Sequence, residues 1–490
     1  MSENNENVVF NPSPDAQRPA EPDSQEAMPP IPKEPQVVNL DSPPPSAPPP
    51  IRSSLFSLGL FIKLGVGLVV LVLLFLLVTR VILPFFSGKE KAKTVTITYW
   101  GLWEDPGVMR TIIGDFERQN PNIKVTYSLQ DIKQYKDRLL TRIPLGNGPD
   151  VFRYHNTWVP VLQKQSIMLP LSQDVITPQE FKKAYYPVIQ NDLIRNGAIY
   201  GIPLGIDTLS LFVNTQIFEE GGYSVPTTWD DFDKVARLLT VREGGVIKTS
   251  GAAMGVYKNV NHASDIVALL MIQNGTNMKN IQATSQNASE ALEFYTSFAN
   301  NTWDASMDKA LDVFARGNLA MYFGYSWDVF PIKTQNKALQ FKVYPVPFIG
   351  ETKLTIASYW VDGISAKSLH QKEAKAFLKF LAQKQTQQKF FTEASKTRDF
   401  GEPYARVDLG QTLKGNQLVY PFVEQAPFAV STYFSSDTYD ESSTNPGINA
   451  RMNQYLQNAV NSVGDNTSAQ SATDTLAKGV SQVLQLYGQK

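Results

Sequence analysis

The stretch VTITYWGLWEDPGVMRTIIGDFERQNPNIKVTYSL, residues 95–129, decides the fold of this chain. Its first five residues alternate apolar and polar side chains, as a half-buried strand does. Pro106 then opens a segment in which apolar residues recur on one helical face, namely Val108, Ile112, Ile113 and Phe116. Pro121 ends that helix, and residues 123–127 form a second alternating segment. The stretch therefore predicts a β-α-β unit with parallel strands.

The same pattern continues toward the C-terminus. A helix is predicted over 135–143, and a third strand over 150–153 follows a glycine-rich turn. Ligands on parallel sheets bind beyond the carboxyl ends of the strands. Aromatic and short polar side chains follow the predicted strands at that edge: Trp100, Trp103, Tyr154, His155 and Asn156. Aromatic rings can cover the apolar faces of a sugar while polar groups bind its hydroxyls, so this edge favours a carbohydrate site over core packing alone.

The N-terminal part differs in composition. Residues 1–53 are rich in proline and poor in aromatic residues, so they are predicted to be a disordered tail. Within 54–88, an apolar run is interrupted only by Lys63 and Arg80, and its uncharged centre would span about 24 Å as a helix. Those two side chains can extend toward the interfaces of a ~30 Å hydrocarbon core. We therefore expect one retained transmembrane helix here, because no cleavage site is plain.

Composition excludes several kinds of chemistry. There are no cysteines, so disulfides, thiolate metal sites, a cysteine nucleophile and a lipid-bearing cysteine are ruled out. The three histidines are far apart, and we expect neither a metal nor a cofactor. The formal net charge of −1 without a basic patch argues against nucleic acid. Glu104-Asp105 could suggest a glycosidase acid, but paired acids at one turn are expected to face solvent, so no catalytic residue is assigned.

Ordered motifs in residues 94–490 resemble those of family 1 extracellular solute-binding proteins of ABC sugar importers, the group that includes maltose-binding protein. The matching segments are Gly148-Pro149-Asp150-Val151-Phe152, Tyr200-Gly201-Ile202-Pro203 with Leu209-Ser210-Leu211-Phe212-Val213-Asn214, Val225-Pro226-Thr227-Thr228-Trp229-Asp230-Asp231-Phe232, Phe314, Gly317 and Ala320-Met321 with Trp327, and Ala366-Lys367-Ser368 before a helix over 374–391. Tyr325 stands where the family usually has a glycine.

The resemblance implies a two-lobed, class II periplasmic-binding-protein-like α/β fold with a cleft between the lobes. Lobe 1 is expected over about 94–205 and 352–400, and lobe 2 over about 210–345 and 402–490. By position, the predicted ligand-binding residues are Trp100, Trp103, Tyr154, Asn156, Asp207, Trp327, Trp360 and Asp362. Tyr359 and Arg398 are further candidates from the same comparison.

The expected function is capture of a sugar or oligosaccharide by a monomeric protein, which delivers it to the permease subunits of an ABC importer. An anchored carbohydrate sensor or adhesion module, or a binder of a non-sugar solute, remains an alternative. A glycoside hydrolase ranks below these. The flanking charges do not set the orientation of the span, because Arg52 precedes it and Lys89, Lys91 and Lys93 follow it. The resemblance implies a single-pass cell-membrane protein with a cytoplasmic tail and an extracytoplasmic binding domain.

Overall fold

The computed structural model describes residues 58–82, 93–442 and 446–489. The chain divides into two compact units, Met1–Gly88 and Lys89–Lys490, and each is considered by itself. In the first unit, helix α1 (Leu58–Leu77) continues into the π-helical turn η1 (Val78–Ile82). Within the described ranges, no helix combines the length and the apolarity that crossing a bilayer requires. The predicted tail, and parts of the predicted 54–88 segment, lie outside the described residues, so the membrane anchor stays a prediction.

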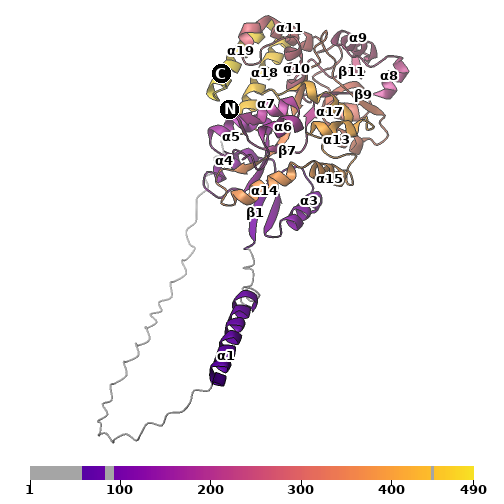
Figure 1. The fold of residues 1–490 in the computed structure, drawn as a ribbon. Coiled ribbons are helices and arrows are strands. Elements are labelled where there is room, and N and C mark those ends of the chain that lie inside the picture. Colours follow the sequence, from indigo (N-terminus) through magenta and orange to yellow (C-terminus); the bar gives the residue numbers. More distant parts are fainter. Residues whose placement is uncertain (1–57, 83–92, 443–445, 490) are drawn as a thin grey trace, which may run out of the picture. The chain divides into compact units, whose positions relative to one another are not determined.

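The second unit contains two lobes, each built on its own sheet (Figure 1). The sheet of lobe 1 runs in the order β2-β1-β3-β15-β4, with β7 also paired to β15. Its strands are β1 (Val95–Gly101), β2 (Ile123–Leu129), β3 (Val151–His155), β4 (Met168–Leu169), β7 (Ile202–Pro203) and β15 (Trp360–Ser365). Strand β1 is parallel to both β2 and β3, which confirms the predicted β-α-β-α-β order. Strand β15 returns from far along the chain and runs antiparallel to β3.

Helices cover the sheet of lobe 1. The first, α3, begins at Pro106 because the Asp105 carboxylate accepts hydrogen bonds from the free N–H groups of Gly107 and Val108. This helix buries Ile112 and Phe116. The helices of this lobe are α3 (Pro106–Gln119), α4 (Tyr135–Arg142), α5 (Val159–Lys164), α6 (Pro178–Ala184), α7 (Pro187–Leu193), α14 (Gln371–Leu381) and α15 (Lys384–Ala394). A small hairpin, β5 (Ile194–Arg195) with β6 (Ala198–Ile199), follows α7.

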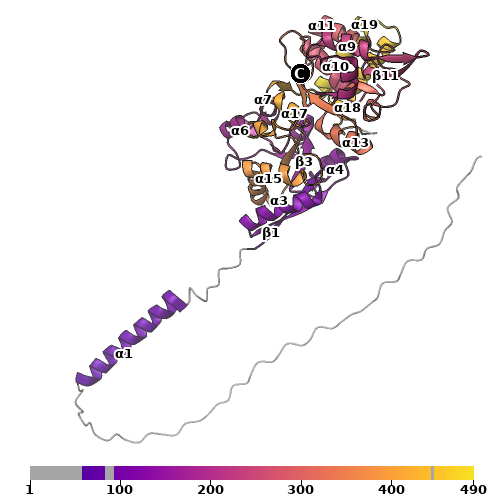
Figure 2. The ribbon, with the colours of Figure 1, turned by 90° about the vertical axis from the view of Figure 1, so that its right-hand side faces the viewer.

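The sheet of lobe 2 has the order β10-β11-β12-β9-β13. Its strands are β9 (Ser210–Asn214), β10 (Val241–Glu243), β11 (Val246–Ala252), β12 (Leu319–Gly324) and β13 (Phe341–Tyr344). Its helices are α8 (Thr215–Gly221), α9 (Trp229–Leu239), α10 (Ala263–Gln273), α11 (Ser285–Thr296), α12 (Ala310–Ala315), α13 (Val329–Gln335), α16 (Val407–Gly410), α17 (Tyr420–Glu424), α18 (Ile448–Gly464) and α19 (Ala469–Leu486). Figure 2 shows α10, α11, α18 and α19 gathered at the end of this unit opposite β1 and α3.

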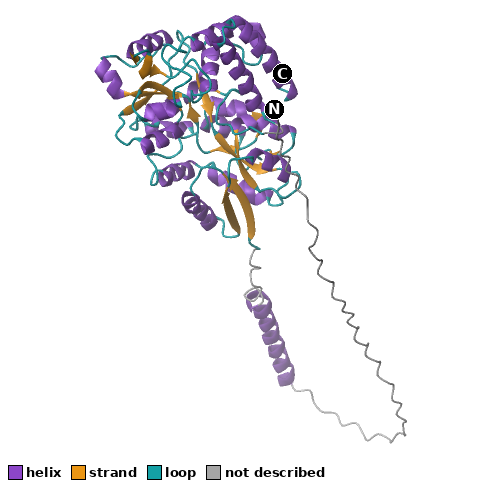
Figure 3. Cartoon of the chain, turned by 180° about the vertical axis from the view of Figure 1, so that it is seen from behind, coloured by secondary structure: helices purple, strands orange, loops and turns teal. Residues whose placement is uncertain are grey.

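The chain crosses between the lobes more than once. Ile206 packs in the core of lobe 1 and Leu209 in that of lobe 2, while Ile356 and Ala357 belong to opposite cores. Short strands make a separate sheet at these crossings: β8 (Asp207–Thr208), β14 (Thr355–Ser358) and β16 (Ala429–Val430). Figure 3 shows the strands of the unit with helices around them. The two-lobed α/β architecture is therefore present, and the crossings place residues from both lobes around one cavity.

Candidate ligand-binding site

A cavity of about 230 Å³ lies where the lobes meet. Its walls come from the loop after β1, the first and second crossings, the start of α13, and two later loops. The lining residues are Trp103, Glu104, Arg153, Leu204, Gly205, Ile206, Asp207, Trp327, Phe330, Ser358, Tyr359, Trp360, Arg398, Glu402, Asp437 and Tyr439. Aromatic rings and charged side chains thus dominate the lining, and each group is positioned by contacts described below.

Lobe 1 presents a wall of contacting aromatic rings. The Trp103 side chain is 44% exposed, and its ring centroid lies 5.7 Å from that of Trp360 and 5.4 Å from that of Tyr439. Trp360 is held in turn by edge contacts with Trp158 and His155. Trp103 has a φ of 69°, a backbone conformation that a bulky side chain rarely adopts. Such strain persists where the surroundings over-determine it, which is common at binding sites.

A buried charge cluster lies directly behind this wall. The Arg153 guanidinium pairs with Asp362 through two hydrogen bonds, of 3.1 and 2.9 Å, and with one carboxylate oxygen of Glu104. Tyr99 donates a 2.7 Å hydrogen bond to Asp362. Burial alone works against the charge on Arg153, but Asp362, with Tyr99 and Glu402, offsets it and the pKa of Arg153 is raised. Glu104 Oε2 is buried and has no hydrogen-bond partner among the described residues.

Lobe 2 presents a single stacked platform. The Trp327 ring lies parallel to Tyr325, with centroids 4.5 Å apart and planes 18° apart. Tyr325 is fully buried and donates a 2.8 Å hydrogen bond to Asp265. The tyrosine that replaces the family's usual glycine therefore supports the tryptophan from beneath. Stacking of this kind fixes the face that Trp327 turns toward the cavity.

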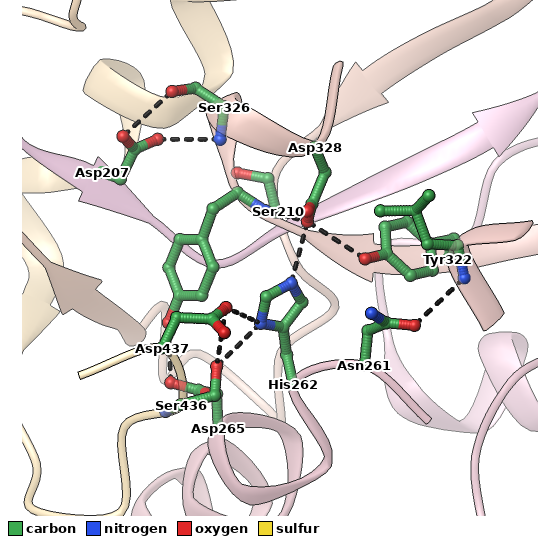
Figure 4. Close-up of polar contacts among 12 residues, drawn as sticks. Asp207, Ser210, Asn261, His262, Asp265, Tyr322, Ser326, Asp328, Ser436 and Asp437 are labelled. Carbon is green, nitrogen blue, oxygen red and sulfur yellow. Dashed lines mark hydrogen bonds and ion pairs between the residues drawn. The ribbon is translucent and has the colours of Figure 1, made fainter. Parts of the chain in front are cut away.

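His262 lies at the centre of a polar cluster with Asp328, Ser436 and Asp437 (Figure 4). Its ring also makes an edge contact with Tyr325, with centroids 5.0 Å apart. Its Nε2 lies 2.8 Å from Asp328, and its Nδ1 lies 2.7 Å from Ser436 and 3.3 Å from Asp437. Burial opposes a charge on this ring, but Asp328 and then Asp437 raise its pKa to about 9. The imidazolium therefore ties the start of α13 to the loop that carries Asp437 and Tyr439 into the cavity.

Asp207 sits at the first crossing and is bonded to lobe 2. Its carboxylate accepts hydrogen bonds of 2.9 Å from both the backbone N–H and the hydroxyl of Ser326. The side chain is nearly inaccessible, and burial followed by the nearby Glu402 raises its pKa to about 8. At neutral pH Asp207 is therefore largely protonated and can donate as well as accept a hydrogen bond.

Arg398 and Glu402 complete the lining. Arg398 donates a 2.7 Å hydrogen bond to Glu402, and its guanidinium lies 5.1 Å from the centroid of the Phe330 ring. Its Nε is buried and, in the part of the chain that the structure describes, has no partner. The ion pair and the ring hold the guanidinium in place beside the cavity.

Four of the predicted residues, Trp103, Asp207, Trp327 and Trp360, line the cavity together, as do the further candidates Tyr359 and Arg398. Asp362 does not line it, because it is fully buried behind Arg153. Trp360 and Asp362 stand two residues apart in β15 and therefore point to the same face of the sheet. Trp360 begins the strand at the cavity, whereas Asp362 lies further along it, where Arg153 and Tyr99 cover its carboxylate.

The structure places the other three predicted residues elsewhere. Trp100 packs toward α4, with Arg142 over its ring at 5.8 Å. Tyr154 is fully buried and donates to the carbonyl of Tyr200. Asn156 donates to Asp192 and Ser431, each at 3.0 Å, and lines a separate cavity. Strand-end position predicted proximity to the edge of the sheet, but not the direction of each side chain.

Sequence reasoning missed several lining residues, and it was wrong about one. Glu104 does not face solvent: it is 6% exposed and paired with Arg153, whereas its neighbour Asp105 caps α3. One signal was available, because Arg153 interrupts an otherwise apolar buried strand and a buried arginine needs carboxylate partners. Nothing local could indicate Glu402, Asp437 or Tyr439, which reach the cavity only through the packing of distant loops.

Residues 101–388 match the family of bacterial extracellular solute-binding proteins, and the chain belongs to that family. A multiple sugar-binding protein of Streptococcus mutans is 24% identical over 335 residues, which are 62% of this chain and 75% of the relative. A maltotriose-binding protein of Pyrococcus abyssi is 19% identical over 246 residues, 49% of this chain and 50% of the relative.

Two solved structures illustrate the shared fold. The sugar-binding protein MalE from Xanthomonas citri superimposes with a TM-score of 0.66 at 20% identity, covering 81% of this chain and all of that one. The maltose-binding periplasmic protein MalE of Listeria monocytogenes, in complex with maltose, gives a TM-score of 0.64 at 18% identity, covering 80% and 98%. At these identities the likeness shows the two-lobed fold alone.

Proposed function

We propose that this protein captures a sugar or short oligosaccharide in the cavity between its lobes. The observation that carries the proposal is the pair of facing aromatic walls, with Trp103 and Trp360 from lobe 1 and Trp327 from lobe 2. Sugar rings have two apolar faces, and both can be covered when the lobes close on them. Buried polar groups between those walls, such as Asp207 and Arg398, match the hydroxyl rim of a sugar.

The size of the cavity limits the ligand. Pockets that enclose drug-sized ligands measure roughly 300–1,000 Å³. The present cavity, at about 230 Å³, lies below that range, which favours a small ligand such as a sugar of one ring or a few rings held as the lobes adjust. The names of the relatives support the class: a multiple sugar-binding protein and a maltotriose-binding protein are among them.

Calorimetric titration of the full chain with a panel of mono- and disaccharides tests the proposal. At least one sugar is expected to bind, with a change in tryptophan fluorescence, because three tryptophans contact the ligand. Trp327→Ala removes one stacking surface, and Asp207→Ala removes a buried hydrogen-bonding group, so each is expected to weaken binding about 10-fold or more. Binding of peptides or polyamines, with silence across the sugars, would contradict the sugar assignment.

A matched control separates loss of the site from loss of the fold. Tyr223 is 37% exposed and does not line the cavity. Tyr223→Ala therefore removes an aromatic ring without touching the site, and its sugar affinity is expected to equal that of the unmodified chain. Equal weakening by Tyr223→Ala and Trp327→Ala would indicate a general effect on folding.

Delivery of the captured solute to an ABC importer is part of the same proposal. Other relatives support it, since two proteins of Pyrococcus horikoshii are named as extracellular-binding proteins of ABC transporters. The importer's permease would receive the solute from the cleft and its ATPase would supply the energy. Uptake of the identified sugar by cells measures the coupling. Cells that lack this chain and cells that express Trp327→Ala are both expected to take up less of it than cells that express the unmodified chain.

We also propose that the apolar segment within 54–88 anchors the binding domain outside the cell. The support is the run of exposed apolar side chains along α1 and into η1, from Val66 to Val78, together with the uncharged composition of this run. A protease added to intact cells is then expected to remove the 94–490 region and to spare the tail. Cleavage of the tail alone would invert the topology, and release of the chain by high salt or carbonate would contradict insertion.

A further inference from the structure

The charges that line the cavity are not balanced. Both arginines of the lining are already engaged with carboxylates, and Arg153 serves two of them, Glu104 and Asp362. Asp437 reaches the cavity from lobe 2, where His262 is shared between it and Asp328. Asp207 adds no charge at neutral pH, because its pKa is raised to about 8 by burial and by Glu402. Acidic groups therefore face the ligand without matching cations.

Among these acidic groups, Glu104 is the one with an unpartnered carboxylate oxygen among the described residues. It is 6% exposed and lines the cavity, and its Oε2 has no hydrogen-bond partner among the described residues. Neighbouring atoms cover this oxygen, so a ligand in the cavity reaches it after a small shift of the side chains around it. The other oxygen, Oε1, is held by Arg153, which fixes the carboxylate in place. A buried carboxylate oxygen left without a donor costs free energy, and the cost is recovered when a ligand supplies that donor.

The rings beside this oxygen favour one kind of donor. Glu104 adjoins Trp103, whose ring contacts both Trp360 and Tyr439, and Tyr439 lies two residues from Asp437. Aromatic faces attract a cation through the ring quadrupole, and they do so more strongly when the cation is desolvated. A carboxylate next to aromatic faces is thus suited to a protonated amine, whereas an anionic group in the same place would meet Glu104 and Asp437. The unpartnered Nε of Arg398 belongs to a guanidinium that is already paired with Glu402.

We propose that the solute is an amino sugar, whose ammonium group is bound by Glu104 Oε2 beside the ring of Trp103. Asp437 supplies a second carboxyl group from the opposite lobe; burial raises its pKa, and the neighbouring His262 counteracts part of that rise. The inference rests on the proposed function, since it names the class of sugar that the same cavity takes. It also excludes uronic acids and sugar phosphates, which carry the opposite charge.

Calorimetry at pH 6 with matched sugars tests the inference, because an amine with an ordinary pKa near 8 is protonated there. The probes are glucosamine, galactosamine and the glucosamine disaccharide. Each is compared with its N-acetylated form and with the parent sugar that carries a hydroxyl in place of the amine. Glucuronic acid is the anionic probe. An amino form is expected to bind at least about 10-fold more tightly than its N-acetylated form, and glucuronic acid is expected not to bind. Added salt is expected to reduce this preference.

Two variants assign the preference to the named carboxylates. Glu104→Gln and Asp437→Asn are each expected to bring the ratio of amino to N-acetylated affinities toward one. Glu219→Gln removes the same charge from an exposed position outside the cavity and is expected to keep the ratio. Asp437 is 41% exposed, so its variant keeps the test decisive if Glu104→Gln fails to fold.

The outcomes separate this inference from the proposed function. Equal or tighter binding of the neutral or N-acetylated sugar overturns the amine and leaves sugar capture standing. A preference that survives in both Glu104→Gln and Asp437→Asn also overturns it. Silence of every sugar in the panel overturns both proposals.

Discussion

The two walls of the cavity use charge in different ways. In lobe 1, one cation, Arg153, holds two carboxylates from strands and loops far apart in sequence, and one oxygen remains free. In lobe 2, His262 lies between Asp328 and Asp437, and Tyr325 and Ser436 satisfy Asp265. The first cluster leaves a charge for the ligand, whereas the second mainly positions Trp327 and the loop that carries Tyr439.

The two buried histidines show the same contrast. The hydrogen-bond partners of His155 in lobe 1 are uncharged: the hydroxyl and the backbone N–H of Thr157 and the hydroxyl of Ser358. Burial lowers its pKa to about 3. His262 is equally enclosed, but neighbouring carboxylates outweigh the effect of burial and raise its pKa to about 9. Burial alone therefore does not set the state of a histidine here; its partners do.

The largest expected effect is the loss of Arg153. Arg153→Met leaves Glu104 and Asp362 buried without their common cation, so the free energy of unfolding is expected to fall by about 3–5 kcal/mol. Denaturant unfolding followed by tryptophan fluorescence measures it. Arg316→Met is the control: its pair with Asp308 is at least half exposed, so the loss should stay below about 1 kcal/mol. Comparable losses in the two variants would contradict the role given to the lobe 1 cluster.

The next effect is the dependence of stability on pH. His262 is expected to control its alkaline side and His155 its acidic side. The folded-state pKa of His262 lies above the ordinary 6.5, so its pairing stabilises fully below pH 6.5 and is lost as pH rises through 9. The folded-state pKa of His155 lies below 6.5, so its contribution is present above pH 6.5 and is lost as pH falls toward 3. Each window is expected to change stability by about 2–4 kcal/mol.

Melting temperatures of His262→Gln and His155→Gln across pH 4 to 9 measure this division. His262→Gln is expected to flatten the alkaline side of the profile, and His155→Gln the acidic side. If both variants altered the same side, the assignment of a charged and a neutral histidine to the two lobes would be wrong.

The smallest expected effect compares two buried tyrosines. Tyr325→Phe removes a hydrogen-bond donor from Asp265 and loosens the support of Trp327. Among the described residues Asp265 has no arginine partner, whereas Asp362 is paired with Arg153. The expected loss of stability is about 1–3 kcal/mol, with weaker sugar binding. Tyr99→Phe removes a donor from Asp362, but Arg153 still holds that carboxylate, so the loss should be about 1 kcal/mol and the affinity unchanged. Chemical unfolding and calorimetry together distinguish the two.

The sequence by itself determined the fold class. Alternation of side chains over 95–99 and 123–127, the helical spacing after Pro106, and the third strand near Asp150 specified parallel pairing, because local periodicity encodes which face each residue buries. The ordered motifs then identified the two-lobed fold and placed Trp103, Asp207, Trp327 and Trp360 at the cavity. Trp103 and Trp327 follow a strand, Asp207 stands at the first crossing, and Trp360 begins β15, so all four lie near the end of an element or at a crossing.

The tertiary structure alone decided the rest of the site. Trp100 and Tyr154 lie near the ends of β1 and β3, and Trp103 lies in the loop that follows β1. The side chains of Trp100 and Tyr154 nevertheless turn into the protein, because direction depends on what packs against each face. Glu104 became buried only because Arg153 lies on the neighbouring strand. Asp437 and Tyr439 reach the cavity more than 300 residues after Trp103, through contacts that no local pattern encodes. Charge balance is a property of such assembled neighbours, which is why the free oxygen of Glu104 could not be read from the chain.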